Sequence, residues 1–200
     1  MTTEVHCTPP SEPPKTLREL RTFLRDDIVA NRSDATKPGV RALMVHRFGN
    51  WRMQIGSRVL RAPFTMLHQS LFRRCRNVYG VEIPWSAKVG RNVVVEHQGG
   101  IVVHGDATIG DGCTIRQGVT IGNRSIEAPF DVPVIGRDVN IGAGAVIVGP
   151  IRLGDGCAIG ANSVVLHDVP AGVTVAGAPA RPISSATTPT HLRIQESNAA

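Results

Sequence analysis

Aliphatic residues recur at every sixth position through the second half of the chain, and this spacing restricts the possible folds more than any other feature. Three runs keep the period in register, and a shift of two residues separates the first run from the second. The fourteen positions are Ile83, Val89, Val95, Ile101, Val103, Ile109, Ile115, Ile121, Ile135, Ile141, Ile147, Leu153, Ile159 and Val165. Neither an α-helix nor an ordinary strand has a period of six. The pattern therefore predicts a triangular parallel β-helix, in which three six-residue units complete one coil.

The composition suits a narrow core built from small branched side chains, with Gly or small residues at the corners. The chain contains 21 Gly, and only 4% of its residues are aromatic. Cys113 and Cys157 follow a Gly in near-identical contexts, "DGCTI" and "DGCAI", and we expect both to be small buried fillers. A β-sandwich with a chance hydrophobic pattern is the alternative, but the usual strand patterns contain few runs of period six.

The sequence divides into four parts. Residues 1–15 are Pro-rich and polar, and we expect a disordered lead-in there. Residues 16–80 have helical periodicity and predict a small α-helical region, which precedes the β-helix domain at 81–183. Residues 184–200 lack periodicity and are expected to form a mobile tail.

The period of six is interrupted once inside the β-helix domain. The spacing from Ile121 to Ile135 is 14 residues, two more than two units. We therefore expect the segment 123–134 to project from the coil as a loop. Insertions in solenoids tend to gather on the functional face, so this loop is a candidate part of the site.

The charge and cysteine patterns exclude several classes of function. Fourteen of the 22 Lys and Arg lie between Lys15 and Arg76, but they alternate with apolar residues and form no continuous run, so we expect no nucleic-acid partner. No run of 18 apolar residues and no apolar signal segment occurs, and we expect a cytoplasmic protein without a transmembrane segment. The four cysteines have no metal-ligand spacing, so no metal site is expected.

The strongest candidate for chemistry is His97, in the segment "VVVEHQGGIVV". The pair Glu96-His97 interrupts an otherwise aliphatic strand, and Gly99 and Gly100 remove side chains beside the histidine. A neutral imidazole can accept the proton of an alcohol as its oxygen attacks a thioester, so His97 is the predicted general base. Two alternatives remain open: His97 is a solvated surface residue, or the nearby His104 is the base.

A general base works better when a carboxylate holds its second ring nitrogen. Glu82 lies 15 residues before His97, close to one coil of the predicted solenoid, and is the candidate for this role. Glu96 is less suited, because adjacent residues on a strand point to opposite faces. We assign Glu96 instead to the acceptor-binding part of the site.

Several stretches between about Asp26 and Ile183 match a known family. They are "EIPWSAKVG" (82–90), "EHQGGIVV" (96–103), "VTIGN" (119–123), "NIGAGAVIVGPIRLGDGCAIGANSVVLHDVP" (140–170) and "AGAPAR" (176–181). On these motifs the chain resembles the serine acetyltransferase family of hexapeptide-repeat acyltransferases, which implies a left-handed parallel β-helix. The last two stretches are the most specific to users of acetyl-CoA.

The resemblance implies a homotrimer with active sites between neighbouring solenoids, and acetyl-CoA as the cosubstrate in the groove between them. It implies that His97 is the catalytic base, that Glu82 stands where the family has the Asp that orients it, and that Asp34 matches an acceptor-binding Asp. No prosthetic group is implied. The implied acetyl-CoA contacts are Gly122, Asn123, Gly144, Ala145, Ala178 and Arg181.

Two departures from the family pattern concern the acceptor. Asp131 and Val132 replace an Arg-His pair whose Arg holds the serine carboxylate, and a His-Pro pair is changed to Pro84-Trp85. Trp85 is a candidate aromatic platform for a sugar ring. We therefore expect the chain to lie closer to the polysaccharide-biosynthesis branch of the family and to acetylate a sugar or exopolysaccharide precursor. The alternatives are serine O-acetylation and a non-catalytic β-helix that serves as an assembly module.

Overall fold

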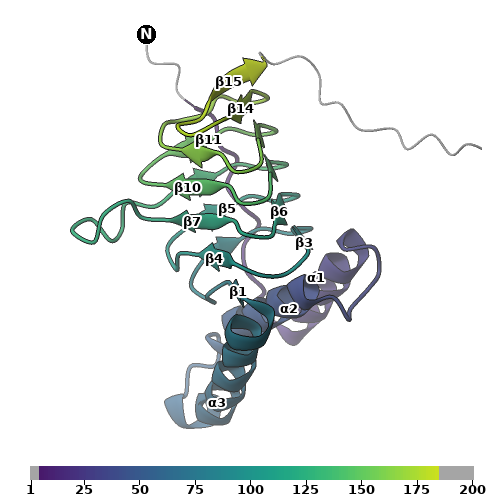
Figure 1. Ribbon diagram of the computed structural model, residues 1–200. Coiled ribbons are helices and arrows are strands. Elements are labelled where there is room, and N and C mark those ends of the chain that lie inside the picture. Colours follow the sequence, from purple (N-terminus) through teal and green to yellow (C-terminus); the bar gives the residue numbers. More distant parts are fainter. Residues whose placement is uncertain (1–4, 185–200) are drawn as a thin grey trace, which may run out of the picture.

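A computed structural model describes residues 5–184 of the chain, and its architecture is a triangular tower of short parallel strands with three helices at its base (Figure 1). The side chains at all fourteen period-six positions are buried in one continuous core, with exposed fractions of 5% or less. Cys113 and Cys157 are fully buried in the same core. The predicted parallel β-helix with a helical N-terminal region is confirmed.

The strands form three flat faces, and successive coils add strands to each face. In face A, the order is β1 (Val81–Glu82), β4 (Ile101–Val103), β7 (Thr120–Gly122), β10 (Val146–Val148) and β13 (Val164–Val165). In face B, the order is β2 (Lys88–Val89), β5 (Thr108–Ile109), β8 (Val134–Ile135) and β11 (Arg152–Leu153). Face C contains β3 (Val94–Glu96), β6 (Thr114–Arg116), β9 (Asn140–Ile141), β12 (Ala158–Ile159), β14 (Thr174–Ala176) and the antiparallel β15 (Arg181–Ser184).

The parallel pairing stacks each aliphatic residue on its counterpart in the next coil. Val103 pairs with Ile121, and Ile121 pairs with Ile147 across the coil that carries the projecting loop. The loop leaves the tower after β7 and returns at β8, and Figure 1 shows it extending sideways. Because the loop projects out of the coil, its extra residues do not change the register in which the aliphatic residues of successive coils stack.

The helical region is built around α2 (Pro38–Arg52). This helix packs against α1 (Leu17–Ala30), α3 (Arg58–Arg74) and the lowest strands of the β-helix. Thr16 and Glu19 form a capping box that fixes the start of α1. The three helices therefore lie under the first coil.

The third helix is attached to this base by a narrow contact. Its N-cap is Ser57, whose hydroxyl accepts a hydrogen bond from the backbone of Leu60 at 3.4 Å. Only His68 of α3 is buried, and Figure 1 shows the helix projecting away from the tower. It continues into a short π-helix, η1 (Cys75–Tyr79), which leads into the first coil. Helices of this type are rare and occur frequently at functional sites.

A buried ion pair joins the helices to the first coil. The Arg47 guanidinium on α2 donates to the Asp27 carboxylate of α1 from Nε, at 2.9 Å, and from a terminal nitrogen, at 3.3 Å. It also donates to the backbone oxygens of Val89 and Gly90, at 2.6 and 2.5 Å. Both charged side chains are fully buried. One guanidinium therefore ties together two helices and the turn after β2.

The N-terminal arm, residues 5–15, differs from the expected disordered lead-in. It runs along the corner between faces B and C, where the backbone and hydroxyl of Ser11 donate to the Asp111 carboxylate at 2.9 and 2.6 Å. Higher up the same corner, the backbone of Thr8 donates to the Asp155 carboxylate at 2.9 Å. Composition alone predicted disorder, because it does not show that corner aspartates are available as acceptors for this segment.

Both expected terminal segments extend beyond the residues that the structure describes. Residues 1–4 of the lead-in and residues 185–200 of the expected mobile tail lie outside the described residues. Within residues 5–184, none of the helices has the length and apolar character needed to cross a membrane. The same range contains no group of three or more side chains suited to hold a metal ion.

Candidate active site

His97 lies at the first turn from face C to face A, between β3 and β4, and its backbone has an unusual conformation. Its φ is +65°, a left-handed value that is uncommon outside glycine and costs of order 1–3 kcal/mol. Gly99 and Gly100 follow with φ values of +101° and +68°, and a Cβ added to Gly99 would meet no atom within 4 Å. The exposed imidazole therefore stands at a strained turn, with open space beside it for a substrate.

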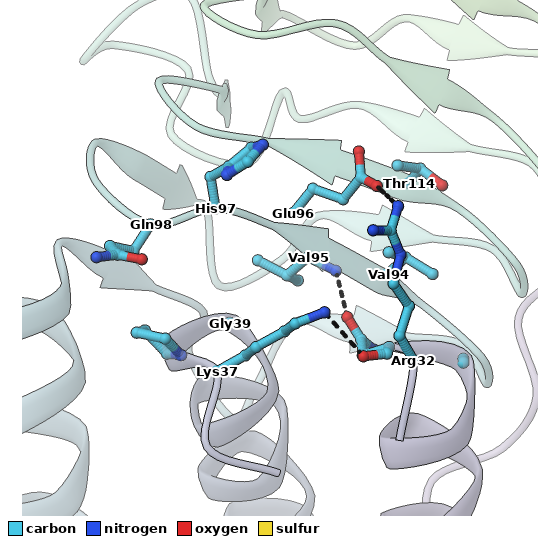
Figure 2. Close-up of a pocket in the computed structure, with 12 residues that line it drawn as sticks. Arg32, Lys37, Gly39, Val94, Val95, Glu96, His97, Gln98 and Thr114 are labelled. Carbon is cyan, nitrogen blue, oxygen red and sulfur yellow. Dashed lines mark hydrogen bonds and ion pairs between the residues drawn. The ribbon is translucent and has the colours of Figure 1, made fainter. Parts of the chain in front are cut away.

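A cavity of about 480 Å³ lies directly beside His97 (Figure 2). His97 and Gln98 border it at the end of β3. Arg32 and Lys37 border it from the turn between α1 and α2. We call this cavity the His97 pocket, and its two sides come from segments about sixty residues apart in the sequence.

Asn31 fixes the α1–α2 turn to the edge of face C. Its side-chain amide donates to the backbone oxygen of Val93 at 3.0 Å and accepts from the backbone of Val95 at 3.1 Å. Because β3 is the edge strand of its face, these bonds occupy groups that would otherwise lack a partner. The turn that carries Arg32 and Lys37 is thereby held beside His97.

The charged groups of the His97 pocket are predominantly basic. Among the described residues that border it, Glu96 is the one carboxylate, and two guanidinium groups pair with it: Arg116 at 3.0 Å and Arg32 at 3.6 Å. The Arg32 side chain is 81% exposed, so its contact with Glu96 is weak and the group can turn to a ligand. Lys37 Nζ donates to the backbone oxygen of Asn31 at 3.1 Å. The pocket therefore suits an acceptor that carries a negative charge.

The start of α2 adds to this positive character. Lys37 is the N-cap of α2 and makes no side-chain cap, and Pro38 and Gly39 of the first turn border the pocket. The first N–H groups of a helix, together with the helix dipole, attract anions. The pocket thus combines a candidate base with a positively polarised wall.

The other predicted acceptor residues lie apart from the His97 pocket. Asp34 accepts hydrogen bonds from the hydroxyl and backbone of Thr36, at 2.6 and 2.8 Å, which lower the pKa of its carboxyl and fix a local turn. Glu82 and Trp85 border a second cavity at the base of face A. In the described part of this single chain, no hydrogen bond or ion pair joins Glu82 to His97.

The rival base, His104, occupies a different corner of the tower. It follows β4 at the turn from face A to face B, and its Nδ1 accepts from the backbone of Asp106 at 3.2 Å. This bond fixes the imidazole to its own turn. His104 does not border the His97 pocket, so the two histidines are separate candidates.

Above His97, the turns from face C to face A stack in a column in which glycines recur. A Cβ added to Gly100 would lie 3.3 Å from the Cα of Gly118, and one added to Gly118 would lie 3.2 Å from the Cα of Gly144. Each turn also donates a backbone hydrogen bond to the turn below, as Gly144 does to Gln117 at 2.8 Å. The column is therefore a closely stacked set of turns that rises from His97, and an extended ligand can lie against it.

Three of the six predicted acetyl-CoA contacts belong to this column. Gly144 and Ala145 form one of its turns. Ala178 lies at its top, in the turn 177–180, which bonds to Val164 of β13. Ala180 N donates to the Val164 carbonyl at 2.8 Å, and Val164 N donates to the Gly177 carbonyl at 3.0 Å. These three residues and His97 therefore lie along a single corner of the tower.

The other three predicted contacts lie elsewhere. Gly122 and Asn123 are at the opposite end of face A, where the projecting loop begins, and the Asn123 amide donates to the backbone of Ser125 at 2.7 Å. Arg181 starts β15 and donates to the Ala180 carbonyl at 3.1 Å. Within one chain, Gly122 and Asn123 are therefore separated from the column by the width of face A.

The family resemblance assigned one residue of the turn 31–37, Asp34, to acceptor binding. Sequence reasoning did not identify Arg32 and Lys37, although Arg32 and Ser33 have left-handed φ values of +65° and +56°. The letters contain no signal that pairs this turn with residues 96–98. The contact depends on how α1 and α2 pack under the tower, which a single sequence does not specify.

Comparison with known proteins points to one group of enzymes. Residues 133–167 match the family model described as "Bacterial transferase hexapeptide (six repeats)". A serine acetyltransferase of Synechococcus elongatus is 39% identical over 146 residues, which is 73% of this chain and 57% of that relative. A serine acetyltransferase of Helicobacter pylori (strain J99) is 36% identical over 147 residues, which is 74% of this chain and 82% of the relative.

A solved structure gives the same result. The crystal structure of serine acetyltransferase in complex with coenzyme A from Brucella abortus strain S19 superimposes with a TM-score of 0.72 at 31% identity, over 86% of this chain and 70% of that one. This chain spans less than two thirds of the length of the Synechococcus relative. The expectation of a closer relation to the polysaccharide-biosynthesis branch is wrong, because these relatives are serine acetyltransferases.

Proposed function

This chain belongs to the serine acetyltransferase family, and on that premise we propose that it transfers the acetyl group of acetyl-CoA to the hydroxyl of serine. The observation that carries the proposal is the exposed His97 at a left-handed turn, beside a pocket with a basic wall. The names of the relatives support serine as the acceptor in place of the sugar that we expected from the sequence.

In the proposed reaction, the neutral His97 imidazole accepts the proton of the serine hydroxyl as its oxygen attacks the thioester carbonyl of acetyl-CoA. The tetrahedral intermediate then collapses, the C–S bond breaks, and the imidazolium returns the proton to the leaving thiolate. The products are O-acetylserine and CoA. General base catalysis of this kind contributes about a hundred- to ten-thousand-fold to the rate. Glu82 is proposed as the residue that orients His97.

Serine carries a carboxylate, and the His97 pocket offers a place for it. We expected a sugar acceptor partly because the projecting loop has Asp131 and Val132 in place of the Arg-His pair whose Arg holds the serine carboxylate in the family. Arg32 and Lys37 provide cations from a different element, the α1–α2 turn, and the N-terminus of α2 lies beside them. We propose that these groups hold the serine carboxylate.

The column above His97 supports a placement for the cosubstrate. An extended pantetheine arm against Gly144 and Ala178 would bring a thioester at its lower end to His97. The remaining predicted contacts, Gly122 and Asn123, lie at the other end of face A. A homotrimer, in which one chain offers its column and a neighbour its projecting loop, would unite the two sets, and we propose this assembly.

The decisive experiment measures release of the CoA thiol from acetyl-CoA with serine as acceptor, beside a panel of sugars and nucleotide sugars. His97→Ala should lower turnover about a hundredfold or more, and Glu82→Gln should lower it less. His104→Ala tests the rival base, and His6→Ala is the matched control, because it removes an exposed imidazole at the corner between faces B and C. Size-exclusion chromatography checks that each variant keeps the assembly of the wild type.

Three outcomes would contradict the proposal. Transfer to a sugar but not to serine would remove serine as the acceptor. Unchanged turnover in His97→Ala, or a larger loss in His104→Ala, would remove His97 as the base. A larger loss in Glu82→Gln than in His97→Ala would mean that the two roles are misassigned.

A further inference from the structure

A second cavity, of about 390 Å³, lies at the base of face A and plays no part in the proposed reaction beyond sharing Glu82. It is bordered by the C-terminal end of α2, by α3 and η1, and by the segment after β1. The His97 pocket lies at the other end of α2, so the two cavities are separate. We call the second cavity the arginine pocket, because Arg52, Arg73 and Arg76 border it.

Two buried groups of the arginine pocket have unused hydrogen-bonding capacity. Arg52 is 5% exposed and lies over the Trp85 ring, 5.3 Å from its centroid, and its Nε has no partner among the described residues. His68 is 3% exposed, and neither of its ring nitrogens has a partner in the same part of the chain. Buried polar groups are nearly always paired, so an unpaired cluster indicates a missing partner.

The charge of the pocket identifies the kind of partner. Burial, followed by the neighbouring Arg52, lowers the pKa of His68 to about 4, so this imidazole is neutral at neutral pH. Three guanidinium groups and one carboxylate, Glu82, then leave a formal charge of +2 around the cavity. The surroundings reinforce this sign, because positions 35–81 contain nine Lys and Arg and no Asp or Glu. Such a field attracts anions from solution.

The geometry points to a phosphate group of a small-molecule ligand as the occupant of the arginine pocket. A phosphate has several oxygens that can each accept from a different guanidinium, whereas a carboxylate is commonly satisfied by one. A phosphate monoester carries a charge of about −1.5 to −2 at neutral pH, which matches the net charge of the cavity. His68 and the free Nε of Arg52 then donate from the buried side, and Arg73 and Arg76 close the mouth.

Calorimetric titration of the full-length protein with pyrophosphate, at neutral pH and constant ionic strength, tests this proposal. Saturable binding is expected, and it should weaken about tenfold or more in the double variant Arg73→Ala/Arg76→Ala, because two charge-assisted contacts are lost. Both arginines are exposed, so the variant should fold. Arg18→Ala/Arg21→Ala is the matched control, since it removes two exposed arginines from α1 and leaves binding intact.

Two further titrations identify the source and the chemistry of the ligand. Succinate has a similar charge but no phosphate, and it should bind more weakly than pyrophosphate. If CoA displaces pyrophosphate, the phosphate that occupies the arginine pocket belongs to the cosubstrate. If CoA does not displace it, the pocket binds a separate ligand. Both results support a phosphate site. The proposal is overturned if pyrophosphate does not bind saturably, if succinate binds equally well, or if both double variants weaken binding equally. Binding is measured without acetyl-CoA, so it is independent of the proposed reaction.

Discussion

The buried pair of Asp27 and Arg47 offers a prediction of stability that the structure makes quantitative. Asp27→Asn keeps the shape of the side chain but removes its charge, and leaves the Arg47 guanidinium buried without a counter-ion. The guanidinium is fully buried, so solvent cannot replace the lost charge. Breaking a buried pair by removing one partner costs about 3–5 kcal/mol.

The neighbouring Asp26 provides a matched control. It pairs with Arg91 at 2.6 Å, but the two side chains are 32% and 36% exposed. Ion pairs with this much solvent access contribute about 0–1 kcal/mol. Asp26→Asn and Asp27→Asn are therefore the same chemical change at adjacent positions, and the structure predicts that only the second is severe.

The assay is urea unfolding followed by circular dichroism, at one protein concentration because assembly also contributes to stability. Asp27→Asn should lower the free energy of unfolding by about 3–5 kcal/mol, and Asp26→Asn by about 1 kcal/mol or less. Arg47→Met should cost more than Asp27→Asn, because it also leaves the backbone oxygens of Val89 and Gly90 without donors. Equal losses in the two Asn variants would refute the assignment of Asp27 and Arg47 as the pair that holds the base together.

Three other predictions concern acid stability, the column and the pocket. Burial lowers the pKa of His46 to about 3, so below pH 6.5 the unfolded chain binds a proton at this residue that the folded chain does not bind. The free energy of unfolding should therefore fall as the pH drops below 6.5, by about 2 kcal/mol at pH 5 from this group. His46→Gln should reduce this dependence on pH in urea unfolding. Gly144→Ala places a Cβ 2.2 Å from Asn162 Oδ1 at a φ of +70° and should cost about 1–2 kcal/mol or more in the same assay, with an unchanged unfolding curve as the contrary result. Lys37→Ala should raise the KM for serine about tenfold with little change in kcat, and Lys88→Ala, on face B, should not.

The fold was predictable because its rule is local and repeats. Every coil requires a branched aliphatic side chain that faces the axis. Ile109 and Leu153 therefore each indicate, from their own coil, the same inward-facing position. The small residues two positions earlier, such as Cys113 and Cys157, follow the same rule and are equally buried. A projecting loop could also be predicted, since the register resumes at Ile135.

The contacts between distant segments could not be predicted, because they depend on packing and not on period. His97 was identifiable as a polar residue in an aliphatic strand, but nothing in the sequence pairs it with the turn that carries Arg32 and Lys37. The ion pair of Asp27 and Arg47 is equally hidden, since a charged residue on a helix usually indicates the solvent side. The sugar acceptor was inferred from a cation missing in the loop, and such an absence does not show which cations other elements provide.

The N-terminal arm changes how the tower should fold. In a solenoid each coil contacts only its neighbours, so its contacts are local and its ends can open one coil at a time. The arm breaks this locality: Ser11 bonds to a residue 100 positions later, and Thr8 to one 147 positions later. The arm can therefore dock only after the upper coils have formed. Once docked, it connects the lower and upper coils, so that the tower should open as one cooperative unit instead of fraying from the top.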